Sequence, residues 1–160
     1  MASLKKTNAV RIMEGANVPF ELLEYEIDEE ALSAEDAAAK TNVPEEQTFK
    51  TLCARGDKIG VMMVCVPAGR ELDFKKLAAA SGNKSVEVVH LKEVTALTGY
   101  VRGGCSPLGT KKKYPVFIDE TAILFDYITV NAGHRGLLFK LTADDLISVT
   151  EAVAADILRD

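Results

Sequence analysis

TFKTLCARGDKIGVMMVCV, residues 48–66, is the stretch of sequence that decides the fold. Two runs of β-branched and other apolar residues flank the polar connection RGDK at residues 55–58, and a four-residue connection that contains glycine predicts a β-hairpin. Side chains alternate between the two faces of a strand, so Lys50 shares a face with the apolar residues Leu52 and Ala54. The ammonium group of Lys50 therefore either reaches water at the edge of the strand or points into a wet cleft.

Helices and further strands surround this hairpin in the sequence. Apolar spacing and capping residues predict a helix that begins at Ser3, carries Leu4, Val10 and Met13 and ends at Gly15, and others over residues 33–40, 74–80 and 91–97. A last helix begins at Thr142 and carries Leu146, Val149, Val153 and Ile157. Strands are expected over residues 20–27, 86–89, 116–119, 127–130 and 137–141. Strands that occur both in a hairpin and between helices predict a mixed α/β fold of the α+β kind, with one domain over residues 1–160.

The composition is that of an ordinary soluble domain. The chain has 160 residues, of which 48% are hydrophobic and 27% are charged, and these values exclude the collagen, coiled-coil and disordered classes. It contains no apolar run near the roughly 20 residues that cross a bilayer, and its first residues lack the apolar core of a signal peptide. We therefore expect a cytoplasmic protein that has no membrane partner.

The cysteines and histidines argue against a disulfide framework and against a metal site. Cys53, Cys65 and Cys105 are odd in number and widely spaced, which is typical of reduced thiols in a cytosolic protein. No C-x-x-C pair occurs, and His90 and His134 are the only histidines. We therefore expect neither a metal ion nor another cofactor.

Charge is distributed unevenly along the chain. The net charge is −5, yet residues 20–46 contain ten acidic residues and one lysine, which leaves +4 for the rest of the chain. Residues 102–113 contain Arg102, Lys111, Lys112 and Lys113 and no acidic residue. Local positive potential attracts phosphate groups over a Debye length of about 8 Å. This distribution permits an anionic partner, although a solvated surface has the same signature.

Residues 98–113 form a long connection without the periodicity of a helix or a strand. Segments of this length without secondary structure are usually functional when they occur inside a domain. The centre of the connection is GGCSPLG, residues 103–109, where glycines allow the backbone to approach a ligand and Pro107 stiffens the turn. Such a loop can offer backbone N–H groups to an oxyanion or a phosphate, or it can be a plain turn.

Two further features leave alternatives open. NAGHRG, residues 131–136, is expected to be a turn between two strands, in which Arg135 could bind a phosphate or carboxylate and His134 could titrate near neutral pH. A glycine-flanked hairpin loop without any function has the same pattern. Cys105 beside Ser106 suggests a thiol hydrolase, but no Cys–His signature connects Cys105 to either histidine.

Together these segments resemble the YbaK family of aminoacyl-tRNA deacylases, which includes the editing domain of bacterial prolyl-tRNA synthetases. The resemblance extends through the whole chain and is carried by FKTL at residues 49–52, LDFKKL at 72–77, TGY at 98–100, GGCSPLG at 103–109 and GHRG at 133–136. The SPLG segment and the chain length fit the stand-alone branch of the family best. The resemblance implies a mixed, mainly antiparallel curved sheet flanked by helices.

The resemblance also implies a reaction and a set of site residues. The stand-alone branch removes cysteine from mischarged Cys-tRNA(Pro): the thiol of the substrate attacks its own ester, so the enzyme orients the substrate and need not supply a nucleophile. By this likeness Lys50, Gly103 and Gly104 would be catalytic. The residues that bind the substrate would be Tyr25, Thr51, Cys105, Ser106, Pro107, Gly109, Gly133 and Arg135. The residues that contact tRNA phosphates would be Arg102, Lys111, Lys112 and Lys113.

The partners implied by the resemblance are the 3′ end of an aminoacyl-tRNA and prolyl-tRNA synthetase, and we expect a monomer.

Three places depart from the usual family pattern: Cys105 inside the glycine loop, Leu138 where aspartate is common, and the region of Leu32, which lacks the expected aromatic residue. Two alternatives therefore stay open. One is a deacylase that clears alanine or serine with an activated water, and the other is a catalytically silent module that binds tRNA or the synthetase.

Overall fold

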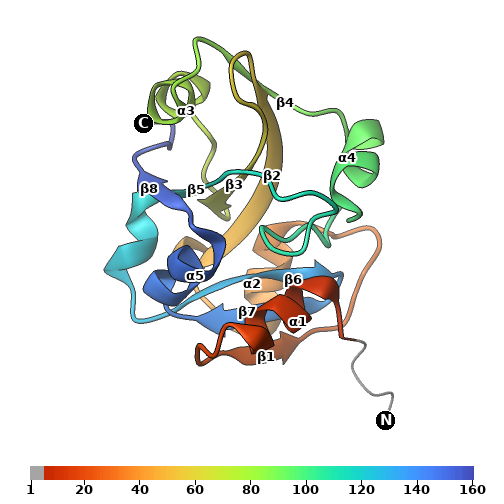
Figure 1. Ribbon diagram of the computed structural model, residues 1–160. Coiled ribbons are helices and arrows are strands. Elements are labelled where there is room, and N and C mark those ends of the chain that lie inside the picture. The colour runs from red at the N-terminus through yellow and green to blue at the C-terminus, as the bar shows by residue number, and fades with distance from the viewer. Residues whose placement is uncertain (1–5) are drawn as a thin grey trace.

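The structure of the protein is a computed structural model, and it describes residues 6–160 (Figure 1). The helices are α1 (Asn8–Gly15), α2 (Ala34–Thr41), α3 (Phe74–Ser81), α4 (Leu91–Thr98) and α5 (Ala143–Thr150), with the short 3-10 helices η1 (Glu45–Gln47) and η2 (Glu120–Leu124). The strands are β1 (Glu21–Glu24), β2 (Thr48–Gly56), β3 (Gly60–Pro67), β4 (Val86–Val88), β5 (Val116–Asp119), β6 (Ile128–His134), β7 (Leu137–Leu141) and β8 (Val153–Ala155).

The eight strands of residues 6–160 belong to one mixed sheet. Its order is β1-β7-β6-β2-β3-β5-β8, and β4 pairs with β2 outside this path. Four strand pairs are antiparallel, among them the predicted β2–β3 hairpin, and three are parallel: β2 with β6, β3 with β5, and β5 with β8. In Figure 1 the long strand β2 runs from the level of β6 and β7 up to the hairpin turn at the top. The predicted mixed, mainly antiparallel α/β sheet is confirmed.

Side-chain caps determine where four of the α-helices begin, and three of these caps are the predicted ones. Ser33, Asp73 and Thr142 each accept a hydrogen bond from the backbone N–H three residues later, at 3.1, 2.9 and 3.1 Å. Each bond satisfies an N–H group that the first turn of the helix leaves without a partner. These three predicted helix starts are confirmed.

The first helix begins later than its apolar pattern indicates. The predicted cap Ser3 and its neighbour Leu4 lie outside the described residues, and α1 begins at Asn8. The cap is Thr7, whose Oγ1 accepts a hydrogen bond from the Val10 N–H at 3.0 Å and donates one to the backbone of β6. This second bond fixes the start of α1 against the sheet.

The predicted final helix is too long. α5 ends before Glu151, which adopts a left-handed conformation with φ 58°, and the chain then forms β8 beside β5. Val153 pairs with Phe117 in the sheet, and the Ile157 N–H donates to the buried carboxylate of Asp119 at 3.1 Å. Ile157 is therefore buried in the second core cluster without being helical, and Val153 pairs with β5 through its backbone while its side chain is 48% exposed.

The bounds of β1 and β6 differ most from the predicted strands. β1 covers Glu21–Glu24, whereas the sequence indicated a strand over residues 20–27. β6 continues through Asn131 to His134, with a β-bulge against β7 between these two residues. The segment 131–136 is therefore a bulged strand followed by a tight connection at residues 135–136, and not a turn throughout.

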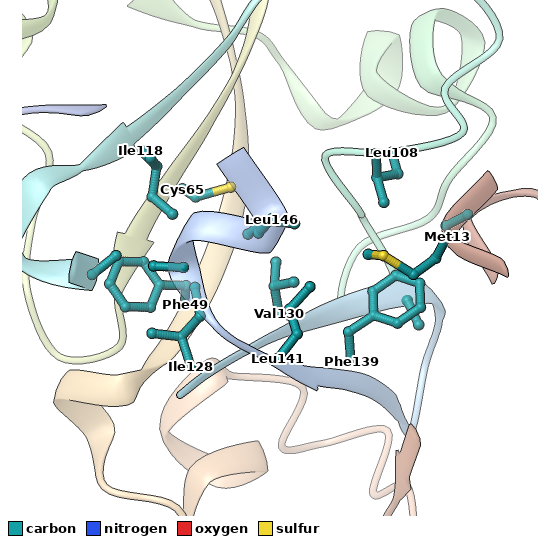
Figure 2. Packing of buried hydrophobic residues seen from close by; sticks show 14 of the residues in the cluster. Met13, Phe49, Cys65, Leu108, Ile118, Ile128, Val130, Phe139, Leu141 and Leu146 are labelled. Carbon is teal, nitrogen blue, oxygen red and sulfur yellow. The ribbon is translucent and has the colours of Figure 1, made fainter. Parts of the chain in front are cut away.

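The largest core cluster contains side chains from β2, β3 and β5 on one side of the sheet order and from β6 and β7 on the other. Phe49 of β2 and Cys65 of β3 pack together with Ile118 of β5, Val130 of β6 and Phe139 of β7 (Figure 2). The other face of β2 contributes to a second cluster, which lies under α3. Both faces of β2 therefore contribute side chains to the core, and the part of β2 between its two sets of strand pairings borders the candidate site.

Candidate functional site

The candidate site lies where the sheet divides. β2 pairs with β6 only at Thr48 and Phe49, and with β4 only over Ala54–Gly56. Between these two places β2 has no partner strand on this side in the described part of the chain, and a cavity of about 390 Å³, the main cavity, opens beside it. This volume is in the range of small-molecule sites. The walls come from β2, α2, the segment from β4 to α4, and the glycine-rich loop.

Six of the predicted site residues line the main cavity: Tyr25, Lys50, Thr51, Arg102, Gly103 and Cys105. The two apolar positions that depart from the family pattern, Leu32 and Leu138, line it as well. Lys50 is half-buried, and its ammonium group has no hydrogen-bond or ion-pair partner among residues 6–160. Of the two readings open to Lys50 in the sequence, the structure therefore supports the wet cleft, where three N–H donors are available to a ligand.

The glycine loop contributes to the wall of the main cavity two residues whose backbone N–H groups are free in the described part of the chain. Gly103 and Cys105 line it, and neither N–H has a hydrogen-bond partner within the described residues. The Gly104 N–H instead donates to the Val101 carbonyl at 2.9 Å, and Gly104 is buried against the backbone of His134 and Arg135. The sequence grouped Gly104 with Gly103 as an oxyanion donor, but the structure uses the Gly104 N–H inside the loop.

Asn131 holds the glycine loop against the bulge of β6. Its Nδ2 donates to the carbonyls of Gly103 at 3.0 Å and of His134 at 3.1 Å. Its Oδ1 accepts from the N–H groups of Gly133 at 2.6 Å and of His134 at 3.1 Å. Asn131 is nearly buried and also lines the main cavity. The sequence pointed to the NAGHRG segment but did not identify Asn131 as a site residue.

Gly133 and Arg135 lie behind the glycine loop. They line a second cavity, of about 260 Å³, with Tyr100 and His134. The Arg135 Nε–H donates to the Arg102 carbonyl at 2.8 Å, so the guanidinium supports the loop backbone. Gly133 and Arg135, which the resemblance places among the substrate-binding residues, therefore line the second cavity and not the main cavity.

The rest of the glycine loop shapes the site without lining it. Ser106 and Pro107 are buried, and the Ser106 Oγ accepts from the Leu108 N–H at 3.3 Å. Gly109 packs tightly on α1, where the Asn8 Nδ2 donates to its carbonyl at 3.1 Å. These residues therefore anchor the loop to the core and to α1.

The basic residues of the loop lie on its exposed side. Arg102 is exposed at the rim of the main cavity, and Lys111, Lys112 and Lys113 are exposed farther along the chain. The Lys113 Nζ forms an ion pair with the Glu151 carboxylate at 2.6 Å. Lys113 is therefore already partnered, whereas no ion pair of Arg102, Lys111 or Lys112 occurs in the part of the chain that the structure describes.

The three thiols are held in their neutral form. Burial raises the pKa of Cys105 to about 12, and the neighbouring Cys53 and Cys65 raise it further in the same direction. Burial likewise raises the pKa of Cys65 to about 12 and raises the pKa of Cys53. Neither histidine lines the main cavity, so Cys105 has no imidazole there to take its proton. This environment argues against the thiol hydrolase.

Tyr25 lines the main cavity, and burial raises the pKa of its hydroxyl above the ordinary value, so the hydroxyl is protonated at neutral pH. Residues 6–160 contain no group of three or more His, Cys, Asp or Glu side chains placed to hold a metal ion. In the same residues, no helix combines the length and the apolar character that crossing a membrane requires.

Comparison with known proteins gives this site its class. The family model of the aminoacyl-tRNA editing domain matches residues 28–149, which include the main cavity's lining from β2 and the glycine loop. The chain belongs to this family, as the sequence resemblance indicated, and by class it is an aminoacyl-tRNA deacylase.

Relatives and solved structures agree with this assignment. EbsC of Enterococcus faecalis, named as a candidate Cys-tRNA(Pro)/Cys-tRNA(Cys) deacylase, is 44% identical over 153 residues, which are 96% of this chain and 93% of EbsC. A proline–tRNA ligase of Thermosipho africanus is 34% identical over 80 residues, which are 50% of this chain and 14% of that enzyme. A solved candidate trans-editing enzyme for prolyl-tRNA synthetase matches with a TM-score of 0.85 and 25% identity over 99% of this chain and 100% of its own.

Proposed function

We propose that this deacylase removes cysteine from mischarged Cys-tRNA(Pro) and that the thiol of the substrate is the nucleophile. The observation that carries the proposal is the pairing, in one cavity, of the unpartnered ammonium of Lys50 with the free backbone N–H groups of Gly103 and Cys105. These groups can orient an ester and stabilise negative charge, but none of them can attack it. A substrate that brings its own thiol fits such a site.

The reaction then proceeds by intramolecular acyl transfer. The cysteine sulfur loses its proton and attacks the ester carbonyl, the carbonyl oxygen becomes negative, and the bond to the terminal ribose breaks. The ribose oxygen takes up a proton, so the products are a cyclic thiolactone and tRNA with a free 3′ end. Each well-placed donor to the developing oxyanion contributes roughly 10²–10³ in rate. Lys50 would hold the ester end of the substrate beside these donors.

The family and the relatives give the wider setting of the proposal. EbsC is named for the same substrate, and the similarity to a proline–tRNA ligase suggests prolyl-tRNA synthetase as a partner. The exposed Arg102, Lys111 and Lys112 would bind phosphates of the acceptor stem. Leu32 and Leu138 would make the wall around the amino acid apolar.

A second candidate function has one observation in its favour. Glu35 lines the main cavity, and one of its carboxylate oxygens accepts from the Gly69 N–H at 3.3 Å. Glu35 is exposed on the wall of this cavity, and a carboxylate there could take a proton from water, which would allow the enzyme to clear alanine or serine. Under this alternative, Glu35→Gln abolishes release of alanine and serine.

The test is release of labelled amino acid from Cys-tRNA(Pro), with Ala-tRNA(Pro) and Ser-tRNA(Pro) assayed in parallel. We expect loss of cysteine alone, and Lys50→Ala should slow it at least roughly 100-fold. Lys58→Ala is the matched control, because Lys58 is exposed in the hairpin turn away from the main cavity. Release of alanine or serine would instead support activated water, and no release from any substrate would contradict deacylation.

A further inference from the structure

The pattern of hydrogen bonds between β2 and β3 determines which way the backbone of β2 points. The Ala68 N–H donates to the Thr48 carbonyl at 2.7 Å, so the bonded pairs of this antiparallel ladder occur at Thr48 and at every second residue after it. Pro67, which has no N–H to donate, stands opposite Phe49 at a non-bonded position, as this alternation requires.

Thr51 also occupies a non-bonded position, opposite Cys65. Its N–H and C=O therefore point away from β3, toward the gap in the sheet. On that side β6 ends its pairing at Phe49, and the next bond that the structure shows is from the Val89 N–H to the Cys53 carbonyl at 2.9 Å. In the described part of the chain, the backbone of Thr51 thus faces the main cavity without a partner strand.

The surroundings of this edge suit a flat aromatic ring. Val88, Leu91 and Val101 line the same cavity, yet 48%, 61% and 47% of their respective surfaces are exposed. Apolar side chains left exposed beside an unpaired backbone donor and acceptor favour a ligand with apolar faces and a polar edge. A nucleobase has this character.

Adenine offers the matching polar edge. Its N6 amino group donates, and the ring nitrogen on either side of it accepts, so one residue's C=O and N–H can bind both. The aminoacyl ester is carried by the terminal adenosine of tRNA, so this base must lie near the reacting atoms. We propose that the open backbone edge at Thr51 binds the terminal adenine, with the carbonyl accepting from N6 and the N–H donating to the adjacent ring nitrogen. This inference rests on the proposed deacylation of aminoacyl-tRNA.

The first experiment changes the substrate. Cysteinylated acceptor-stem RNA that ends in adenosine is compared with the same RNA ending in purine riboside, which lacks N6, and with 1-deaza- and 7-deazaadenosine, which lack one ring nitrogen each. We expect purine riboside to lower kcat/KM roughly 5- to 150-fold, the range of one two-point base contact. One deaza analogue should show a similar loss, and it identifies the nitrogen that binds. Equal rates with all four substrates would overturn the proposal.

The second experiment changes the backbone. Thr51→Pro removes the N–H, and because this N–H points to the open edge, the ladder with β3 loses no bond. We expect this variant to lose the preference for a ring nitrogen that the wild type shows, whereas Thr51→Val, which keeps the N–H, should retain it. If the Thr51→Pro enzyme still prefers adenosine to the deaza analogue, a group other than the Thr51 N–H binds the ring nitrogen.

The outcomes also separate this inference from the proposed function. Release of cysteine from the adenosine substrate without any preference among the analogues would contradict the Thr51 contact alone. Failure to release cysteine from any substrate would contradict the proposed function itself. The substrate series on the wild-type enzyme decides the adenine contact even where Thr51→Pro does not fold.

Discussion

At the scale of single residues, Asn131 connects two parts of the site that are distant in the chain. Its amide ties the Gly103 carbonyl to the bulge at Gly133 and His134. We expect Asn131→Ala to lower kcat roughly 100-fold with a much smaller change in KM, because a displacement of about 1 Å at the reacting centre has this effect on rate. Steady-state kinetics on Cys-tRNA(Pro) measures both constants.

Two further variants show whether Asn131 acts by positioning the loop. Asn131→Asp keeps an acceptor for the Gly133 and His134 N–H groups but replaces the donor to the Gly103 and His134 carbonyls with a second acceptor, so the folded variant should lose kcat. Asn8→Ala removes an exposed amide that also bonds to the glycine loop, at Gly109, and should have little effect. Wild-type kcat in a folded Asn131→Asp enzyme would contradict a positioning role.

The environment of Cys105 makes a prediction about pH. Its pKa of about 12 keeps the thiol neutral in the assay range, whereas an ordinary cysteine thiol, such as that of the substrate, has a pKa of about 8.5. If the substrate thiol attacks, the enzymatic rate should rise with pH and level off above about 8.5, and Cys105→Ala should retain both the rate and the profile. Spontaneous ester hydrolysis is subtracted at each pH. A rate that climbs steadily to pH 10 and vanishes in Cys105→Ala would identify Cys105 as the nucleophile.

Sequence reasoning located the residues that carry unusual local signals. Lys50 stood out because a charge on an apolar strand face needs an explanation, and Gly103 because a glycine cluster interrupts a long loop. Asn131 gave no such signal, since asparagine is common in turns and its four hydrogen bonds depend on a bulge that only the folded sheet creates. For the same reason, the sequence did not indicate that Arg135 lines the second cavity and donates to the Arg102 carbonyl.

At the scale of secondary-structure elements, the glycine loop depends on its contact with α1. Gly109 has φ 72°, and a Cβ there would lie 2.6 Å from the Tyr100 Oη and 2.7 Å from the Ala9 N. We expect Gly109→Ala to lower the free energy of unfolding by about 2–4 kcal/mol, from the strained conformation and the crowding together. Thermal unfolding of the purified variant measures this loss.

Gly15→Ala is the matched control for Gly109→Ala. Gly15 ends α1 at an ordinary φ, and a Cβ there would have no neighbour within 4 Å. Alanine should therefore leave stability unchanged or raise it by up to about 1 kcal/mol, because it restricts the unfolded chain. Equal melting temperatures for the two variants would contradict the tight packing of Gly109 on α1.

Elements whose signals are local were predicted well, and elements made by the tertiary fold were not. Ser33, Asp73 and Thr142 cap their helices as the sequence indicated, because a cap involves residues only three positions apart. The strand β8 could not be read from the sequence, since its apolar spacing also fits one more turn of helix. β8 forms by pairing with the edge of β5, which lies more than 30 residues earlier in the chain, so local sequence does not indicate it.

At the scale of the whole molecule, the basic residues that the sequence concentrates in residues 102–113 are exposed on the surface. The sequence located the basic window 102–113, but it could not tell which of its cations are free. The structure pairs Lys113 with Glu151 at 2.6 Å, and both side chains are 73% exposed. Arg102, Lys111 and Lys112 remain as three cations available to phosphates.

Three such contacts predict how tRNA binding responds to salt. Each phosphate contact releases counterions and contributes roughly −0.7 to −0.9 to the slope of log association constant against log salt, so the wild type should show a slope of about −2 to −3. Lys112→Gln should make the slope shallower by about 0.7–0.9, because it removes one free cation. Lys113→Gln, the same chemical change at a residue already bound to Glu151, should alter the slope much less. A flat salt response in the wild type would remove these cations from the tRNA interface, and equal effects of the two variants would mean that the Lys113–Glu151 pair opens when tRNA binds.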